Sequence, residues 1–234
     1  MEKFPNFGPD YETLEELGRG STGIVFKAWG KAHERLFALK TIWPRPGETW
    51  EIRLTRFYRE VRLVACCNGN PNIVAAYSIN QYEDKYFFVR EFVDGETLQV
   101  KIAKKPFSPR DASQIAETLC QTVQFIHGMG MVHRNLTEDN VLLTADGTPK
   151  LIGFGKAKIF AEPLTLEDFS IDIQALGKIL FSLLAGKPSV PDAFSLFPDA
   201  LATICRKCWN IAPENQYHSA MELAENLRRY LEKA

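Results

Sequence analysis

The sequence has no long apolar run and no excess of basic residues. Its longest apolar stretch, Ile179–Ala185, is interrupted by Ser182, so no membrane span is expected. Residues 1–10 lack the apolar segment of a secretory signal. Lys and Arg number 28 against 29 Asp and Glu, so the positive charge that nucleic-acid binding requires is missing. These absences predict a cytoplasmic protein with neither a membrane nor a nucleic acid as partner.

The cysteines do not form a recognisable framework. Their number is five, which is odd, and this favours a reducing compartment over a set of disulfides. Cys205 and Cys208 have the spacing of half a metal or redox site, but no second pair matches them. We therefore expect Cys208 to pack inside a helix.

The 234 residues, 45% of them hydrophobic, predict one or two domains, with strands first and helices later. In the first part, alternation predicts a strand over 36–42, and helical spacing predicts a helix over 51–67. Further strands are expected over 73–78 and 86–92. In the second part, Ser108 and Pro109 open a long helix, and an Asp146-Gly147 turn joins a short hairpin. Buried and amphipathic helices are expected over 173–184 and 220–231.

A glycine-rich pattern stands near the N-terminus. Gly18, Gly20, Gly23 and Val25 form G-x-G-x-x-G-x-V. A strand-like segment follows these glycines, which argues against a dinucleotide-binding turn because that turn opens a helix. The pattern therefore indicates either a hairpin whose bare backbone covers phosphates or an ordinary glycine turn.

Three further motifs favour the phosphate interpretation. Lys40 ends F-A-L-K on the expected strand 36–42, and Glu60 on the next helix can reach its ammonium group. His133-Arg134-Asn135 and Asn140 come later, followed by Gly153-Phe154-Gly155. In order and spacing these strings resemble the motifs of protein kinases, most closely the bacterial serine/threonine group, from about residue 11 to residue 231.

The resemblance implies an α+β, bilobal protein-kinase-like fold: a strand-rich N-lobe with one helix over residues 1–93 and a helical C-lobe over 94–234, together one domain. It also implies a nucleotide site. The residues carried over to that site are Gly18, Gly20, Gly23, Val25, Ala38, Lys40, Glu60, Arg90, Glu91, Val93, Asn140 and Leu142.

The catalytic positions depart from the family pattern. Asn135 stands where the family has its catalytic Asp, and Gly153 stands where it has the magnesium-holding Asp. Thr137 replaces the usual Lys. Losing a general base alone costs about 10²–10⁴ in rate. No catalytic residue is intact, and Asn140 is at most the single remaining metal ligand.

The segment after Gly155 is short for an activation loop, and Ala161-Glu162-Pro163 scrambles the usual A-P-E motif. Gln216 stands where the family has the Arg partner of that motif. Because both halves of one ion pair are missing, the departures indicate a native sequence rather than an engineered knockout.

Arg90 is a permanent cation at a position that the family fills with an apolar or small residue. A buried charge needs a partner, so we expect Arg90 to pair with Glu60 in competition with Lys40, which would lower nucleotide affinity. The alternative is that Arg90 extends outward and has little effect.

The sequence therefore predicts a pseudokinase, a catalytically impaired module that binds an unidentified protein partner, with ATP as a candidate ligand bound without Mg²⁺. The alternative is a weak serine/threonine kinase that uses Lys40, Glu60 and Asn140 and recruits Asp139 or Asp146 as a substitute carboxylate.

Overall fold

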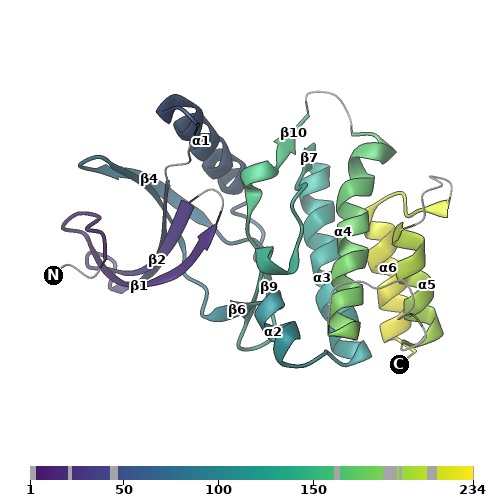
Figure 1. The fold of residues 1–234 in the computed structure, drawn as a ribbon. Coiled ribbons are helices and arrows are strands. Elements are labelled where there is room, and N and C mark those ends of the chain that lie inside the picture. The colour runs from purple at the N-terminus through teal and green to yellow at the C-terminus, as the bar shows by residue number, and fades with distance from the viewer. Residues whose placement is uncertain are drawn as a thin grey trace. The chain divides into compact units, whose positions relative to one another are not determined.

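The computed structural model describes residues 4–20, 23–42, 47–160, 164–186, 194, 197–209 and 215–233. The chain divides into two compact units, Met1–Asp94 and Gly95–Ala234. The first is strand-rich with one helix and the second is mainly helical (Figure 1), so the predicted α+β class is confirmed. The predicted lobe boundary lies beside this division, and the joint action of the two lobes as one domain stays a prediction.

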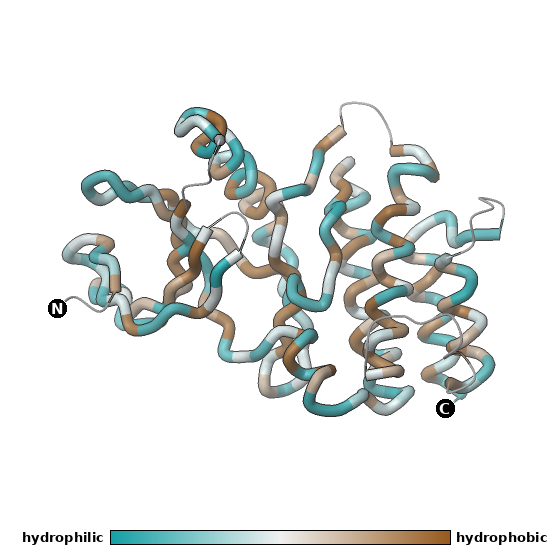
Figure 2. The backbone as a smooth tube through the Cα atoms, viewed as in Figure 1, coloured by the Kyte–Doolittle hydropathy of each residue, from teal (hydrophilic) through white to brown (hydrophobic). Residues whose placement is uncertain are grey.

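The N-terminal unit contains a five-stranded antiparallel sheet in the order β1-β2-β3-β5-β4. Its strands are β1 (Tyr11–Gly20), β2 (Gly23–Gly30), β3 (Arg35–Thr41), β4 (Ala76–Tyr82) and β5 (Lys85–Glu91). The turn between β4 and β5 is hydrophilic, as the teal hairpin tip in Figure 2 shows. The strands expected over 36–42 and 86–92 are confirmed.

The strand expected over 73–78 begins later, at Ala76. Ile73 and Val74 are buried as an irregular segment. The Asn68 side chain donates to the Ala76 carbonyl at 2.7 Å and accepts from the Ala76 N–H at 2.9 Å. This side-chain clamp replaces a strand partner at the point where the sheet begins.

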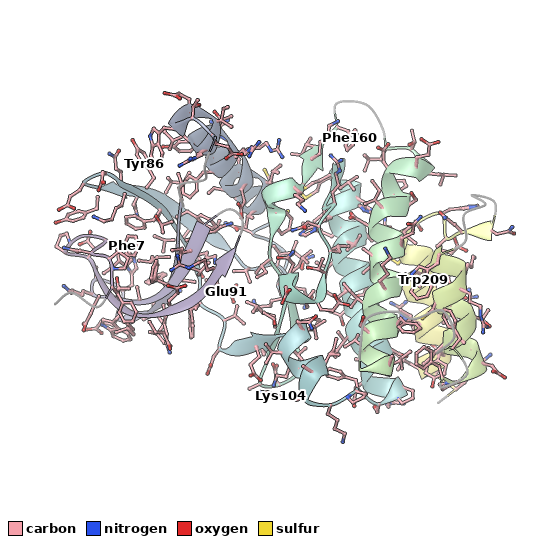
Figure 3. The ribbon with its side chains drawn as sticks, in the orientation of Figure 1. Phe7, Tyr86, Glu91, Lys104, Phe160 and Trp209 are labelled. Carbon is pink, nitrogen blue, oxygen red and sulfur yellow. The ribbon has the colours of Figure 1, made fainter. Side chains whose placement is uncertain are left out.

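The two faces of this sheet bury different residues. One face carries a core built around Phe7, Phe26, Leu39 and Phe87 (Figure 3 labels Phe7). The other face meets α1 (Trp50–Cys66), which opens on the N-cap Thr49. Cross-strand pairing places Lys40 beside Phe88 and Ala38 beside Arg90 on one face, and the Phe57 ring from α1 packs 5.7 Å from that of Phe88.

The C-terminal unit is built on helices. These are α2 (Leu98–Lys104), α3 (Pro109–Gly128), α4 (Leu166–Ala185), α5 (Asp199–Trp209) and α6 (Ala220–Leu231). Helices α3, α4, α5 and α6 lie side by side (Figure 1). Ser108 caps α3 by accepting from the Asp111 N–H at 3.1 Å, as predicted.

Short strands and 3₁₀ turns connect the helices. The strands are β6 (Gly95–Thr97), β7 (Met131–Val132), β8 (Val141–Thr144), β9 (Pro149–Leu151) and β10 (Lys158–Ile159), and the turns are η1 (Glu138–Asn140) and η2 (Phe154–Lys156). β8 and β9 form the predicted hairpin, with Gly147 at φ +85° in its turn. Such a positive φ favours glycine.

Helix α4 is longer than predicted. It begins at Leu166 because Thr165 and Asp168 form a reciprocal capping box, a polar start that the apolar pattern over 173–184 does not reveal. The helix expected over 220–231 is confirmed as α6.

The cysteine pair lies in α5. Cys205 and Cys208 are both buried, and burial raises the pKa of the Cys205 thiol to about 12. Within the described ranges, no group of three or more His, Cys, Asp or Glu side chains could hold a metal ion. None of the helices described is long and apolar enough to cross a bilayer.

Candidate functional site

A buried ion pair forms in the N-terminal unit between Lys40 on β3 and Glu60 on α1. The Lys40 Nζ lies 2.5 Å from Glu60 Oε1, and both side chains are less than a tenth exposed. The Lys40 ammonium also lies 5.9 Å from the centre of the Phe88 ring. The contact between Lys40 and Glu60 agrees with what the spacing indicates.

Arg90 does not take Glu60 away from Lys40, so the predicted competition is wrong. Burial lowers the pKa of Lys40, the Glu60 carboxylate opposes that shift, and the Arg90 cation adds to it. Burial also lowers the pKa of Arg90, again opposed by Glu60. Arg90 is therefore near the pair without joining it. The single Glu60 carboxylate is taken by Lys40 because the ammonium makes the direct hydrogen bond.

The glycine-rich segment forms the end of the β1–β2 hairpin. Gly18 pairs with Val25 and Gly20 pairs with Gly23, while Val25 also pairs with Lys40 on β3. A Cβ at Gly23 would lie 1.9 Å from the Thr41 carbonyl oxygen, so packing requires glycine there. A Cβ at Gly18 or Gly20 would meet nothing within 4 Å. Packing within the described structure therefore does not explain the two earlier glycines.

The end of β5 carries two further candidate residues. The Glu91 carboxylate accepts from the Ala75 N–H at 3.2 Å, and the Glu91 N–H donates to the Ala75 carbonyl at 2.9 Å. Glu91 is labelled at this strand end in Figure 3. Val93 follows the strand and is half-buried.

In the C-terminal unit, the residues at the degenerate catalytic positions lie together. The Asn140 amide nitrogen donates to the Asn135 carbonyl at 2.9 Å and to the Thr137 hydroxyl at 3.1 Å. The Asn135 amide in turn donates to the Gly153 carbonyl at 3.4 Å. Leu142 follows on β8 and is half-buried. Both amides therefore donate to oxygens of this segment or of Gly153.

Gly153 has a left-handed backbone conformation, with φ +86°. A Cβ there would lie 2.2 Å from Asn140 Oδ1. The space that a side chain at residue 153 needs is therefore filled by the Asn140 amide. An aspartate in its place requires Asn140 to move and break the two hydrogen bonds that it donates.

The sequence motifs missed the residue that anchors this segment, Asp172 on α4. This fully buried carboxylate accepts from the backbone N–H groups of His133 and Arg134, each at 2.8 Å, and contacts His127 Nε2 at 2.9 Å. The signal was available: Asp172 is an acidic residue within an apolar helical run, and buried acids require hydrogen-bond donors.

The residues on either side of this anchor differ in burial. The rings of His133 and Phe154 pack edge to face at 4.7 Å. The Arg134 side chain is exposed, and its charge contributes to lowering the pKa of Asp168. The Arg134 backbone, at φ +60°, donates the hydrogen bond to Asp172.

The two substitute carboxylates differ in availability. Asp146 accepts from the hydroxyls of Thr144 and Thr148, and these hydrogen bonds lower its pKa. The Asp146 carboxylate is therefore already hydrogen-bonded within the β8–β9 turn. Asp139 is exposed on η1 beside Asn140.

The donor set near Asn140 does not fit a magnesium site. Magnesium is held through one or two carboxylates, whereas residues 135 and 153 supply an amide and a glycine. The segment after η2 returns through β10, which pairs with β7, and Ala161-Glu162-Pro163 lies outside the described residues. Gln216 is buried.

Residues 11–171 match the protein kinase domain family. The chain belongs to this family. The matched range contains the hairpin glycines, the Lys40–Glu60 pair and the Asn135–Gly153 segment, while α5 and α6 follow it.

Relatives come from bacteria and eukaryotes. The probable serine/threonine-protein kinase PknB of Lactococcus lactis is 30% identical over 204 residues, covering 77% of this chain and 32% of that protein. The serine/threonine-protein kinase PknD of Protochlamydia amoebophila is 24% identical, covering 95% of this chain and 30% of that protein. Myosin light chain kinase A of Dictyostelium discoideum is 28% identical, covering 85% of this chain and 76% of that protein. The chain spans about a third of the length of the two bacterial relatives.

Proposed function

We propose that this kinase domain is a pseudokinase: a module that binds a protein partner and a nucleotide without efficient phosphoryl transfer. One observation carries the proposal. Around Asn140 there is an amide at residue 135 and no side chain at Gly153, and the space beside Gly153 is filled by Asn140 itself. Phosphoryl transfer depends on positioning and charge neutralisation by metal ions, and neither residue 135 nor residue 153 supplies a carboxylate for either.

Features of the N-terminal unit support nucleotide binding. The Lys40–Glu60 pair is formed, and Gly18 and Gly20 are retained where packing does not require glycine. A bare hairpin backbone can approach phosphate groups closely. Since the carboxylates for Mg²⁺ are missing, we propose that ATP binds in its metal-free form.

A phosphotransfer assay tests the catalytic part of this proposal. The wild-type chain is incubated with ATP and Mg²⁺ or Mn²⁺, and ADP formation and protein phosphorylation are measured beside the Lys40→Met variant. We expect the wild type to show no more turnover than the Lys40→Met variant. Turnover that is lost in Lys40→Met, and also in Asp139→Asn, would establish the alternative of a weak kinase with a recruited carboxylate.

A matched variant separates Asp139 from general effects of surface charge. Asp84 is exposed in the β4–β5 turn, so Asp84→Asn removes the same charge far along the sequence from η1. If Asp84→Asn and Asp139→Asn change the assay equally, Asp139 has no special role.

A further inference from the structure

The inner face of the N-terminal sheet carries two cations and one anion. The register places Lys40 beside Phe88 and Arg90 beside Ala38, so both cations project from the same face toward α1. Glu60 is the acidic residue among the buried side chains of α1. It is also the single buried acid among the residues described in the N-terminal unit.

The pairing on this face leaves the Arg90 Nε without a hydrogen-bond acceptor among the described residues, although the Glu60 carboxylate still attracts the guanidinium. Glu60 Oε1 is held by Lys40 at 2.5 Å. Arg90 is half-buried, its Nε atom is enclosed, and no described residue accepts a hydrogen bond from that nitrogen. A guanidinium remains charged at any physiological pH. Two cations on this face therefore share one buried acid, Glu60.

Holding an excess cation in a partly buried position costs free energy unless an anion pairs with it. A guanidinium presents parallel N–H donors that match two oxygens of a phosphate or carboxylate. Arg90 sits on a central strand whose backbone is paired on both sides, with β3 and with β4. A ligand can therefore contact Arg90 only through its side chain.

We infer that Arg90 and Lys40 form an oxyanion site that holds a phosphate group of a nucleotide in its metal-free form. The inference rests on the proposed function and names the charge that replaces the metal ion. Metal-free ATP carries more negative charge than its magnesium complex. The second cation, Arg90, supplies positive charge beside Lys40 that a nucleotide without its magnesium ion otherwise lacks.

Binding to three probes tests this site. Calorimetric titrations in EDTA use ATP, tripolyphosphate, which has no base or sugar, and adenosine, which has no phosphate. The proteins are the wild type, Arg90→Met, Arg90→Lys and Arg62→Met. Arg62 is an exposed arginine on α1, so Arg62→Met is a control for the loss of one positive charge.

The wild type is expected to bind ATP and tripolyphosphate in EDTA. A hydrogen bond to a charged group contributes about 1.5–3 kcal/mol, so Arg90→Met should weaken both ligands by about ten- to a hundredfold. Arg90→Lys keeps the positive charge but not the parallel N–H donors of the guanidinium, so its affinity should lie between those of the wild type and Arg90→Met. Arg62→Met should match the wild type, and adenosine should bind the wild type and Arg90→Met equally.

Unliganded Arg90→Met is also informative because it removes the second cation. Its melting temperature without ligand should equal or exceed that of the wild type, while the shift caused by ATP in EDTA should shrink. This pair of opposite effects separates a ligand site from a purely structural arginine. If Arg90→Met does not fold, Arg90→Lys supplies the comparison.

Three results would overturn the inference. ATP binding that is unchanged or tighter in Arg90→Met would mean that the arginine obstructs the ligand. A loss that extends to adenosine would place Arg90 against the base instead of a phosphate. Absence of both ATP and tripolyphosphate binding in EDTA by the wild type would exclude the site. None of these results depends on the phosphotransfer assay, so the failure of the site and the failure of the proposed lack of catalysis are distinguishable.

Discussion

The two units of this chain have kept different parts of the kinase pattern. The N-terminal unit retains the charged pair of Lys40 and Glu60 and the glycines of the β1–β2 hairpin. The C-terminal unit retains the framework of its catalytic segment, anchored by Asp172, but not the carboxylates at residues 135 and 153. Under the proposed function, groups that bind the nucleotide are kept and groups that carry the chemistry are lost, so that the architecture of the site persists without its reaction.

The largest effect is expected at Asp172, because the framework of the C-terminal unit depends on it. Asp172→Ala leaves two backbone N–H groups and the His127 ring without their acceptor. Breaking such a buried network costs about 3–5 kcal/mol. Urea denaturation measures the loss, and hydrogen exchange should place it in β7 and the residues that follow.

Asp172→Asn is the matched variant. It keeps the size and one acceptor oxygen and should cost less than Asp172→Ala. If Asp172→Ala lowers the free energy of unfolding by less than about 1 kcal/mol, the anchoring role is wrong.

The ion pair of the N-terminal unit should respond asymmetrically. Glu60→Gln leaves Lys40 and Arg90 as two neighbouring cations, whereas Lys40→Met leaves Glu60 with Arg90 as its new partner. We expect Glu60→Gln to cost about 3 kcal/mol or more and Lys40→Met to cost less. Thermal and urea unfolding of both variants measures the difference. Equal losses would mean that Arg90 does not interact with Glu60.

The stability cost of adding a side chain at Gly153 has two parts, which a comparison with a matched glycine separates. Gly147 has φ +85° and open space around its Cα, whereas Gly153 has φ +86° and the Asn140 amide in contact distance. Gly147→Ala reports the backbone cost alone, about 1 kcal/mol. Gly153→Ala should cost about 1–2 kcal/mol more.

Adding Asn140→Ala to Gly153→Ala should recover part of the extra cost, because the two side chains no longer compete for one space. Urea denaturation of the wild type, Gly153→Ala, Asn140→Ala and the double variant completes this cycle. Equal costs for Gly147→Ala and Gly153→Ala would show that Asn140 yields freely, and the segment would then be open to a restored aspartate.

How much of this was predictable depends on where the signal lies. The strand that carries Lys40, the α3 cap at Ser108 and the pairing of Lys40 with Glu60 follow from local spacing and chemistry. The outcome at Arg90 does not, because two cations compete for one carboxylate and only their distances decide which one binds it. Asp172 directly precedes the helix predicted over 173–184, but the N–H groups that donate to its carboxylate belong to residues 133 and 134, which are far away in the sequence.

The smallest expected effect is a change of stability with pH at the N-terminal cap of α4, the helix that carries Asp172. The backbone N–H and hydroxyl of Thr165 hold the pKa of Asp168 below its ordinary value. A carboxyl group with a lowered pKa in the folded state contributes stability above its unfolded pKa, about 4, and loses it as the pH falls through the folded value. The capping contribution should therefore fade below about pH 4.

Asp168→Asn should remove this part of the acid dependence while leaving the rest of the profile unchanged. Hydrogen exchange at the first turn of α4, measured between pH 3 and pH 6, reports it. An unchanged acid slope in Asp168→Asn would mean that the cap does not depend on charge.

The central claim is that the N-terminal unit keeps its nucleotide-binding residues although the C-terminal unit lacks the catalytic carboxylates at residues 135 and 153. Thermal unfolding with ATP tests this claim most directly. The melting temperature is measured with a saturating concentration of ATP in Mg²⁺ and in EDTA. A ligand at 100 times its Kd stabilises the folded state by about 2.7 kcal/mol, which is readily measured. The account predicts a rise in melting temperature that is as large in EDTA as in Mg²⁺. A rise that occurs only with Mg²⁺ would contradict it, because a carboxylate would then be holding the metal that Asn135 and Gly153 cannot hold.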